Sequence, residues 1–310
     1  MHDFLQQGIK DSTSRGRNAA MHDSLQQGIK NSTSRGRNAA MNMDYLRTEL
    51  FPLFWCGGCG NGAVLGAIAR SFEDLAYTKE NTVVVTGIGC WGKADDYVKT
   101  NAFHGTHGRA LAFATGIKLA NPKLNVIALM GDGDGATIGG NHFIHTARRN
   151  VDITAVIVNN YNYGMTGGQL SGTTPENAKT TTSRYGHVEP AFDICKLAEA
   201  AGAPFVARAA TDNPVLMQRL ITEGLSKKGF AFIEAIAPCP THFGRNNGMG
   251  DAPSLMRWVK ELSVPYEKAK SMADSELEGK LVMGKLVDKY SEDYGTKYRK
   301  IVESLQQKEG

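Results

Sequence analysis

Two short polar clusters follow apolar runs in the middle of the chain. Residues 131–134 read Gly-Asp-Gly-Asp and follow the run 125–130, and Asn160 closes an Asn-Asn pair that follows the run 153–158. Because ligands of an open parallel sheet gather at the carboxyl ends of its strands, we expect Asp132 and Asn160 to face one crevice. A carboxylate and an amide oxygen suit Mg²⁺, which completes its octahedron with phosphate oxygens and water. The glycines would let backbone N–H groups approach a diphosphate at the start of the next helix.

The cysteines form a second candidate site. Cys195 lies in a helical pattern and is predicted to pack as a small hydrophobe. The other four lie beside glycines or prolines at the ends of apolar runs, at Cys56, Cys59, Cys90 and Cys239. Four thiolates suit a 4Fe-4S cluster or a structural zinc ion, and a Cys-x-x-Cys pair also suits a redox dithiol. The second Cys-x-x-Cys of a zinc ribbon is missing, but the spacing alone leaves all three kinds of site open.

Seven separated motifs occur in order over about residues 45–260. They are Trp55-Cys56-Gly-Gly-Cys59-Gly60, Gly87-Ile-Gly-Cys90, His104-Gly-Thr-His107-Gly-Arg-Ala110, Gly131-Asp-Gly-Asp134, Asn159-Asn160, Tyr163-Gly-Met-Thr-Gly-Gly-Gln169 and Ala237-Pro-Cys-Pro-Thr241. The Gly-Asp-Gly and Asn-Asn motifs have the spacing of the thiamine diphosphate fingerprint. The whole set resembles the beta subunits of the 2-oxoacid:ferredoxin oxidoreductases, most closely those of the 2-oxoglutarate type. One departure is a glycine at both 57 and 58, where many members of that family have a proline.

This resemblance implies roles for individual residues. The metal ligands would be Cys56, Cys59, Cys90 and Cys239 for a 4Fe-4S cluster, and Asp132, Asn160 and the backbone of Asn162 for Mg²⁺. The residues in contact with thiamine diphosphate would be Ile88, Gly89, Trp91, Gly131, Gly133, Asp134, Gly164, Met165 and Thr166. Lys93 is a candidate cation for the substrate carboxylate and His107 a group close to the cofactor, and both are assigned catalytic roles.

The resemblance also implies an activity. The chain would oxidise 2-oxoglutarate with coenzyme A to succinyl-CoA and CO₂ and pass the electrons through the cluster to ferredoxin. An alpha subunit would supply the domain that binds the aminopyrimidine of thiamine diphosphate. Pyruvate or a branched-chain 2-oxoacid stays open as the substrate. A non-oxidative thiamine diphosphate decarboxylase subunit would not need four positioned cysteines, and a zinc-stabilised binding protein would not need the spacing of Asp132 and Asn160.

Alternating strands and helices are predicted to position these residues. Apolar runs near residues 83, 125, 153, 204 and 230 alternate with helical patterns near 61, 105, 140, 190 and 214. This order predicts an α/β fold with a doubly wound, mostly parallel sheet, which in this family is the diphosphate-binding fold of thiamine diphosphate enzymes.

Three regions are expected along the chain. Residues 1–20 recur almost unchanged as 21–40, and this polar, duplicated extension 1–40 is predicted to be disordered. Residues 41–263 are expected to form the domain that binds thiamine diphosphate and the 4Fe-4S cluster. The charged tail 264–310 is mostly helical in pattern and is predicted to contact the partner subunit.

Composition limits the classes of partner. At 310 residues and 41% hydrophobic, the chain is long enough to bury a large core. A net charge of +4 is too small to indicate a nucleic-acid partner. No apolar run reaches the roughly 18 residues that would indicate a membrane span. Few cysteines, most of them assigned to a site, suit a reducing compartment, so a cytoplasmic enzyme subunit is expected.

Overall fold

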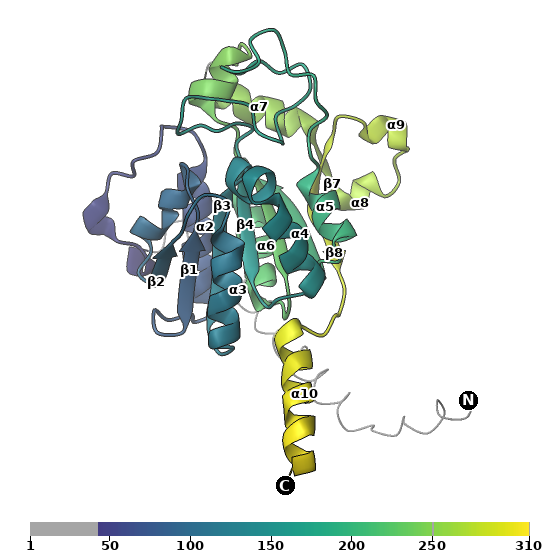
Figure 1. The fold of residues 1–310 in the computed structure, drawn as a ribbon. Helices are drawn as coiled ribbons and strands as arrows, with labels where there is room; N and C mark the ends of the chain where they lie inside the picture. The colour runs from purple at the N-terminus through teal and green to yellow at the C-terminus, as the bar shows by residue number, and fades with distance from the viewer. Residues whose placement is uncertain (1–42, 250, 310) are drawn as a thin grey trace. The chain divides into compact units, whose positions relative to one another are not determined.

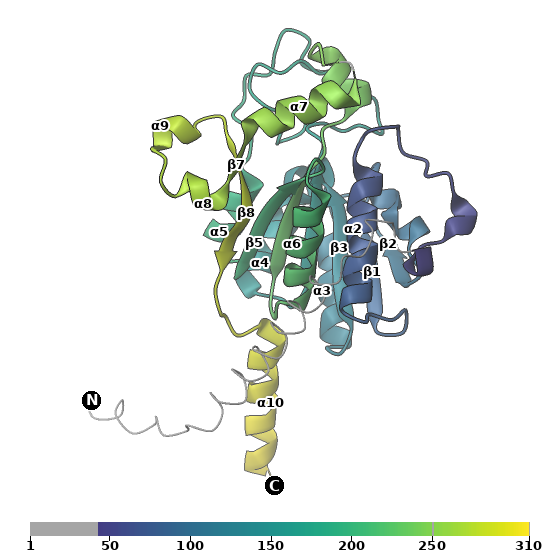
Figure 2. The same cartoon turned by 180° about the vertical axis from the view of Figure 1, so that it is seen from behind.

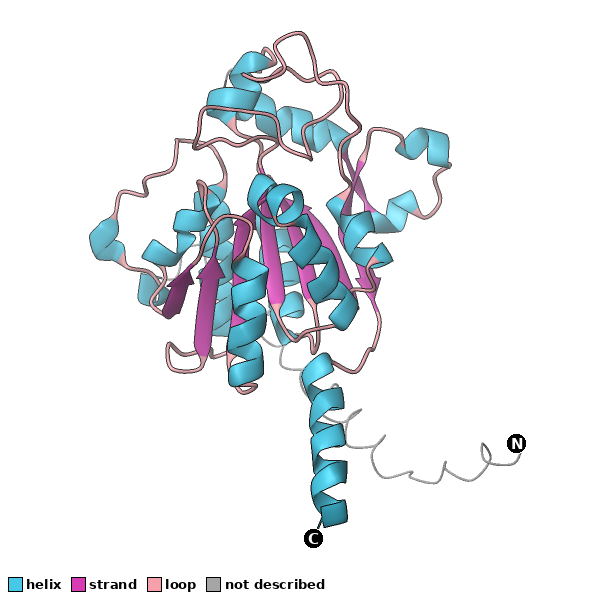
Figure 3. Ribbon diagram, in the orientation of Figure 1, coloured by secondary structure: helices cyan, strands magenta, loops and turns pink. Residues whose placement is uncertain are grey.

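An eight-stranded sheet forms the centre of the protein, for which the computed structural model describes residues 43–249 and 251–309 (Figures 1 and 3). In spatial order its strands are β2 (Asn101–His104), β1 (Thr82–Thr86), β3 (Asn125–Gly131), β4 (Thr154–Asn159), β6 (Ala231–Ile236), β5 (Phe205–Ala210), β8 (Leu281–Asp288) and β7 (Ser263–Pro265). The first six pair in parallel, whereas β8 runs antiparallel to β5 and parallel to β7. The predicted mostly parallel α/β sheet is therefore confirmed.

Helices cover both faces of this sheet, as views from opposite sides show (Figures 1 and 2). One face packs against α2 (Asn61–Asp74) and α6 (Pro214–Ser226). The other packs against α3 (Ala110–Ala120), α4 (Gly140–Arg149) and α5 (Ile194–Ala200). Every residue of β4, β5 and β6 is buried, as expected for parallel strands covered on both faces.

Side-chain caps fix where three of the helices begin. Asp193 accepts hydrogen bonds from the first backbone N–H groups of α5, and Asn213 accepts one at the start of α6. Asp251 does the same for α7 (Ala252–Leu262). Such oxygens satisfy N–H groups that have no partner inside a helix, typically stabilising it by about 1 kcal/mol.

The region 264–310 completes the sheet in addition to forming helices. The helical prediction is right for α8 (Tyr266–Ala269), α9 (Asp274–Leu277) and α10 (Tyr294–Glu309), but it is wrong for β8. That strand reads Leu-Val-Met-Gly-Lys-Leu-Val-Asp, with a glycine and a lysine that weaken the strand pattern. Its pairing with β5, a long-range contact, decides its conformation.

Loops and α7 lie over the carboxyl ends of the strands (Figure 3). A third apolar cluster there contains Tyr161, Phe243 and Leu255, which come from the loop after β4, the loop after β6 and α7. Two wide π-helical turns, η4 (Gly133–Ile138) and η5 (Pro240–Gly244), follow strands at this edge. Such turns are frequent at functional sites.

Two further predictions concern disorder at residues 1–40 and the lack of a membrane span. The disorder predicted for residues 1–40 lies outside the described residues. Across the ranges that the structure describes, none of the helices combines the length and the apolar character needed to cross a membrane.

Candidate functional site

Four neighbouring strands bring the predicted motifs to one edge of the sheet. β1, β3, β4 and β6 are adjacent and parallel, so the loops that follow them all leave at the carboxyl edge. The Asn160 N–H lies 3.4 Å from Asp132 Oδ1, and the Cys239 N–H donates to the Asn160 carbonyl at 3.2 Å. Hydrogen bonds thus join the two halves of the predicted magnesium site to each other and to the fourth predicted cluster ligand.

Asp132 is buried and is held by two hydroxyl groups. Ser171 and Thr173 donate to its Oδ2 at 2.5 and 2.6 Å. Burial raises the pKa of Asp132, while these two hydrogen bonds act in the opposite direction. Oδ1 accepts the long hydrogen bond from Asn160, which leaves that oxygen with lone-pair capacity for a cation.

The turn after β4 presents further oxygen ligands. Tyr161 adopts a left-handed conformation with φ 64°, which is uncommon for a bulky residue and reverses the chain at this point. As a result, the Asn162 N–H donates to Asn160 Oδ1 at 3.1 Å. Both amide atoms of the Asn162 side chain are buried, and neither has a hydrogen-bond partner among the described residues. Unsatisfied buried polar atoms beside Asp132 fit a site built for a polar ligand.

Asp134 joins three loops of the site. Its Oδ1 accepts hydrogen bonds from His107 Nδ1 at 2.5 Å, the Gly108 N–H at 2.7 Å and the Ile88 N–H at 3.3 Å. A Cβ at Gly87 would lie 2.1 Å from Asp134 Oδ2, so only glycine fits there. With Nδ1 bound to a carboxylate, His107 keeps Nε2 for contact with a ligand.

The glycines of the site leave room at its surface. A Cβ at Gly89 or Gly131 would meet nothing within 4 Å, and Gly89 has a φ of +124°. Gly133, in contrast, lies against the Tyr163 ring, whose hydroxyl donates to the Gly133 carbonyl at 3.2 Å. A Cβ on Gly164 would stand 3.4 Å from Asn162 Oδ1 and 3.6 Å from Cys90 Sγ, so this glycine adjoins both predicted half-sites.

The remaining predicted cofactor contacts differ in exposure. Ile88, Met165 and Thr166 are exposed, and Thr166 Oγ1 donates to Gln169 Oε1 at 2.6 Å. Trp91 is 1% exposed and packs in the core against Trp55. Its side chain is therefore turned away from the surface, which leaves its backbone for the predicted contact.

The four loop cysteines gather at the same edge. Burial, together with the nearby thiols of Cys239, Cys59 and Cys56, raises the pKa of Cys90 to about 11. Burial likewise raises the pKa of Cys59, with smaller contributions from Cys56 and Cys239. Four thiolates so close together repel one another unless a cationic centre joins them, and such a centre favours their deprotonation.

Hydrogen bonds hold two of these cysteines in place. The Trp55 indole N–H donates to the Cys90 carbonyl at 2.6 Å, and the His242 N–H donates to Cys239 Sγ at 3.4 Å. In the Cys-x-x-Cys loop, Gly58 has φ +80° and a Cβ there would lie 2.2 Å from Ala252 Cβ. A Cβ at Gly57 would meet nothing within 4 Å, so of the two glycines only Gly57 has room for a side chain.

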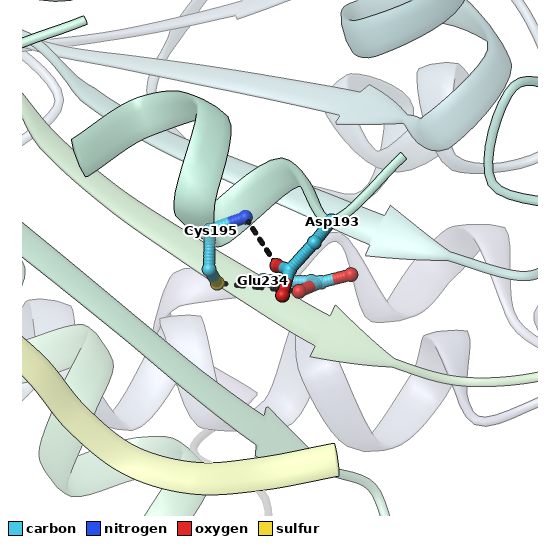
Figure 4. Close-up of side chains that lie close together, drawn as sticks. All are labelled: Asp193, Cys195 and Glu234. Carbon is cyan, nitrogen blue, oxygen red and sulfur yellow. Dashed lines mark hydrogen bonds between the residues drawn. The ribbon is translucent and has the colours of Figure 1, made fainter. Parts of the chain in front are cut away.

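Cys195 lies apart from this set, as predicted. It is 2% exposed and lies in α5, on the side of the helix that packs into the apolar core. It is also more polar in its contacts than a small hydrophobe, because its thiol donates to Glu234 Oε2 at 3.2 Å (Figure 4). Asp193, Cys195 and Glu234 place their ligand atoms within 4.8 Å of one another.

Lys93 forms an ion pair that the sequence analysis did not anticipate. Its Nζ lies 2.5 Å from Asp96 Oδ2, and both side chains are about half exposed. The hydrogen bond to Asp96 raises the pKa of Lys93, so the ammonium stays charged. Its assignment to a substrate carboxylate stays a prediction.

That assignment can be tested by substitution. If Lys93 meets the distal carboxylate of a dicarboxylic 2-oxoacid, Lys93→Met should raise the KM for 2-oxoglutarate by about 10-fold or more, because a charged hydrogen bond is lost. Steady-state kinetics of the assembled complex measures this change. The matched variant Asp96→Asn removes the ion pair and keeps the ammonium, so its KM should stay low. Equal KM values in wild type and Lys93→Met would rule out the contact.

Several residues that shape the site were not assigned a role from the sequence. Ser171 and Thr173 hold Asp132, while Asn159, Glu234 and Arg208 form a buried polar network behind it. The run Ser171-Gly-Thr-Thr-Pro175 is rich in hydroxyl groups, which is the one local signal available. It lies in a long loop, so its proximity to Asp132 depends on the tertiary fold.

Comparisons with known proteins agree with this geometry. Residues 87–235 match the C-terminal TPP binding domain of thiamine pyrophosphate enzymes. The chain is 45% identical over 263 residues to the 2-oxoglutarate synthase subunit KorB of Methanocaldococcus jannaschii, covering 85% of this chain and 97% of the relative. It is 56% identical over 199 residues to the KorB subunit of Archaeoglobus fulgidus, covering 64% and 74%.

A solved structure is similar over most of the chain. It is a 2-oxoglutarate:ferredoxin oxidoreductase from Magnetococcus marinus with 2-oxoglutarate, coenzyme A and succinyl-CoA bound. The TM-score is 0.77 at 29% identity, covering 88% of this chain and 92% of the other.

Proposed function

The chain belongs to the family of 2-oxoglutarate:ferredoxin oxidoreductase beta subunits, and from that premise we propose how its residues serve the oxidative decarboxylation of 2-oxoglutarate. The family and the substrate are those predicted from the sequence. In the proposal, the beta subunit holds thiamine diphosphate through Mg²⁺ and holds a 4Fe-4S cluster beside it. The products are succinyl-CoA and CO₂, and the electrons pass to ferredoxin.

The carboxyl edge of the sheet carries this proposal. Asp132, Asn160 and the backbone of Asn162 would hold Mg²⁺, and the lone-pair capacity of Asp132 Oδ1 fits that role. Cys56, Cys59, Cys90 and Cys239 would hold the cluster, and the mutual effect of their thiols fits a bound cationic centre. When bound, thiamine diphosphate supplies the electron sink for decarboxylation and the cluster supplies one-electron acceptance.

Side chains of the protein would position the cofactors and the substrate. Asp134 holds the loop of Ile88 and the ring of His107 in fixed relation to the Asp132 turn. His107 would exchange a proton through Nε2, and Lys93 would bind the distal carboxylate. Gly164 adjoins both half-sites, since a Cβ there would be in van der Waals contact with Asn162 and Cys90.

The proposed function requires partner proteins and a reducing compartment. An alpha subunit would supply the aminopyrimidine domain, and the beta chain would act only within that complex. Coenzyme A and ferredoxin would be its further reactants, and the tail 264–310 would contact the alpha subunit. The cysteine usage supports a reducing, cytoplasmic compartment.

One measurement separates this function from the alternatives. The complex purified anaerobically should contain four iron atoms per beta chain and show the broad visible absorption near about 400 nm of a 4Fe-4S cluster. Bleaching of that band by 2-oxoglutarate and coenzyme A would link the cluster to the reaction. A colourless sample loaded with zinc would support a binding protein, and turnover of 2-oxoglutarate without ferredoxin reduction would support a non-oxidative decarboxylase.

A further inference from the structure

A buried network of polar side chains lies behind the Asp132 site. Glu234 on β6 and Arg208 on β5 are 2% and 5% exposed, and Arg208 Nε donates to Glu234 Oε2 at 2.6 Å. A second guanidinium nitrogen of Arg208 donates to Asp193 at 2.5 Å. Asp193, Cys195 and Glu234 lie close together (Figure 4). The Arg208 guanidinium serves as the cation of this group, which needs no metal ion.

The other oxygen of Glu234 determines the orientation of the Asn159 amide. Asn159 Nδ2 donates to Glu234 Oε1 at 2.8 Å. An ionised carboxylate only accepts hydrogen bonds, so the amide must turn its NH₂ toward Glu234 and its oxygen away. That oxygen accepts the Tyr161 N–H at 3.2 Å.

This orientation supports the metal-binding turn. The Tyr161 N–H belongs to the residue with the left-handed backbone, directly between Asn160 and Asn162. The Thr173 hydroxyl lies 3.0 Å from Asn159 Oδ1 and 2.6 Å from Asp132 Oδ2. Because the Thr173 hydroxyl has one hydrogen, which Asp132 Oδ2 accepts at the shorter distance, the Asn159 oxygen acts on the predicted magnesium site through its hydrogen bond from the Tyr161 N–H.

We propose that Glu234, held in place by Arg208, is a positioning residue that fixes the Asn159 amide and thereby organises the Mg²⁺–diphosphate site. The proposal rests on the function proposed above. It depends on a single orientation of the Asn159 side-chain amide. With Asn159 rotated by half a turn, an NH₂ group would face the Tyr161 N–H, and the turn would lose the hydrogen bond that stabilises its strained residue.

Glu234→Gln tests this directly. Arg208 requires an acceptor, so the glutamine must turn its oxygen toward Arg208 and its NH₂ toward the NH₂ of Asn159. We expect the affinity of the alpha–beta complex for thiamine diphosphate and Mg²⁺, measured by titration calorimetry, to fall by about 10-fold or more, as for other residues that orient metal ligands. Iron content and the melting temperature without thiamine diphosphate report whether the variant is folded.

Cys195→Ala is the matched control. It removes the hydrogen bond from the thiol to Glu234 Oε2 and leaves the hydrogen bond between Asn159 and Glu234 Oε1 in place. We expect its cofactor affinity to match wild type. If Cys195→Ala and Glu234→Gln weaken binding equally, general disturbance of the core explains the effect and the positioning role is wrong.

Two further variants keep the test decisive. Asn159→Ala removes the link but keeps the ion pair of Arg208 and Glu234, so it should weaken binding even if Glu234→Gln fails to fold. Asp132→Ala should abolish binding. If Asp132→Ala loses cofactor binding while Glu234→Gln or Asn159→Ala keeps full affinity, the positioning role alone is wrong. If the wild-type complex itself binds no thiamine diphosphate, the proposed function is wrong as well.

Discussion

Asp132→Ala should abolish thiamine diphosphate retention and turnover while the iron of the complex stays in place. Asp132 is the carboxylate that the thiamine diphosphate motif offers to Mg²⁺, and its Oδ1 has the lone-pair capacity for the ion. Loss of a residue that only orients a metal ligand weakens binding by about 10- to 100-fold, so loss of the ligand itself should exceed that range. Calorimetric titration with thiamine diphosphate and Mg²⁺, together with iron analysis, measures both quantities.

A matched variant separates charge from shape in this experiment. Asp132→Asn keeps an oxygen that can accept hydrogen bonds from Ser171 and Thr173, so it should fold as well as the wild type. It lacks the negative charge and should still bind Mg²⁺ poorly. If Asp132→Asn and wild type bind the cofactor alike, the magnesium ligand has been assigned to the wrong residue.

The parts of the fold that could be predicted are those that depend on nearby sequence. Five apolar runs became β1, β3, β4, β5 and β6, because strands covered on both faces consist of continuous buried residues. The parallel pairing then placed the ends of four strands together, so Asp132 and Asn160 could be expected to meet. The short edge strands β2 and β7 carry no such pattern and were missed, and so was β8, whose pattern a glycine and a lysine interrupt.

The supporting residues of the site could not be predicted for a related reason. Thr173 lies 41 residues from Asp132 in sequence, and Glu234 lies 75 residues from Asn159. No local pattern connects such pairs, because the contact exists only after the sheet and its loops have formed. Charged residues in an apolar strand, such as Arg208 in β5 and Glu234 in β6, are the available sign of a buried pair.

Removing one loop cysteine should remove the cluster. Cys90→Ala or Cys239→Ala should lose iron and the visible absorption near about 400 nm, because a cluster with one thiolate missing is exposed and labile. Ferredoxin reduction should disappear with it. Thiamine diphosphate affinity should fall less, since the Asp132 site keeps its ligands. Iron analysis, the visible spectrum and titration with the cofactor measure these three effects on the same sample.

Cys195→Ala provides the control for the cysteines because it removes a thiol from the same subunit at a different place. Cys195 lies on the buried side of α5 and contacts Glu234, so its loss should cost about 1 kcal/mol of stability from packing and leave the iron bound. The contrast is sharpest against Cys239, which is also buried but lies at the carboxyl edge beside Asn160. If the iron content fell in Cys195→Ala and not in Cys239→Ala, the fourth ligand of the cluster would be wrongly assigned. The cluster would then have to lie within the core and not at the carboxyl edge of the sheet.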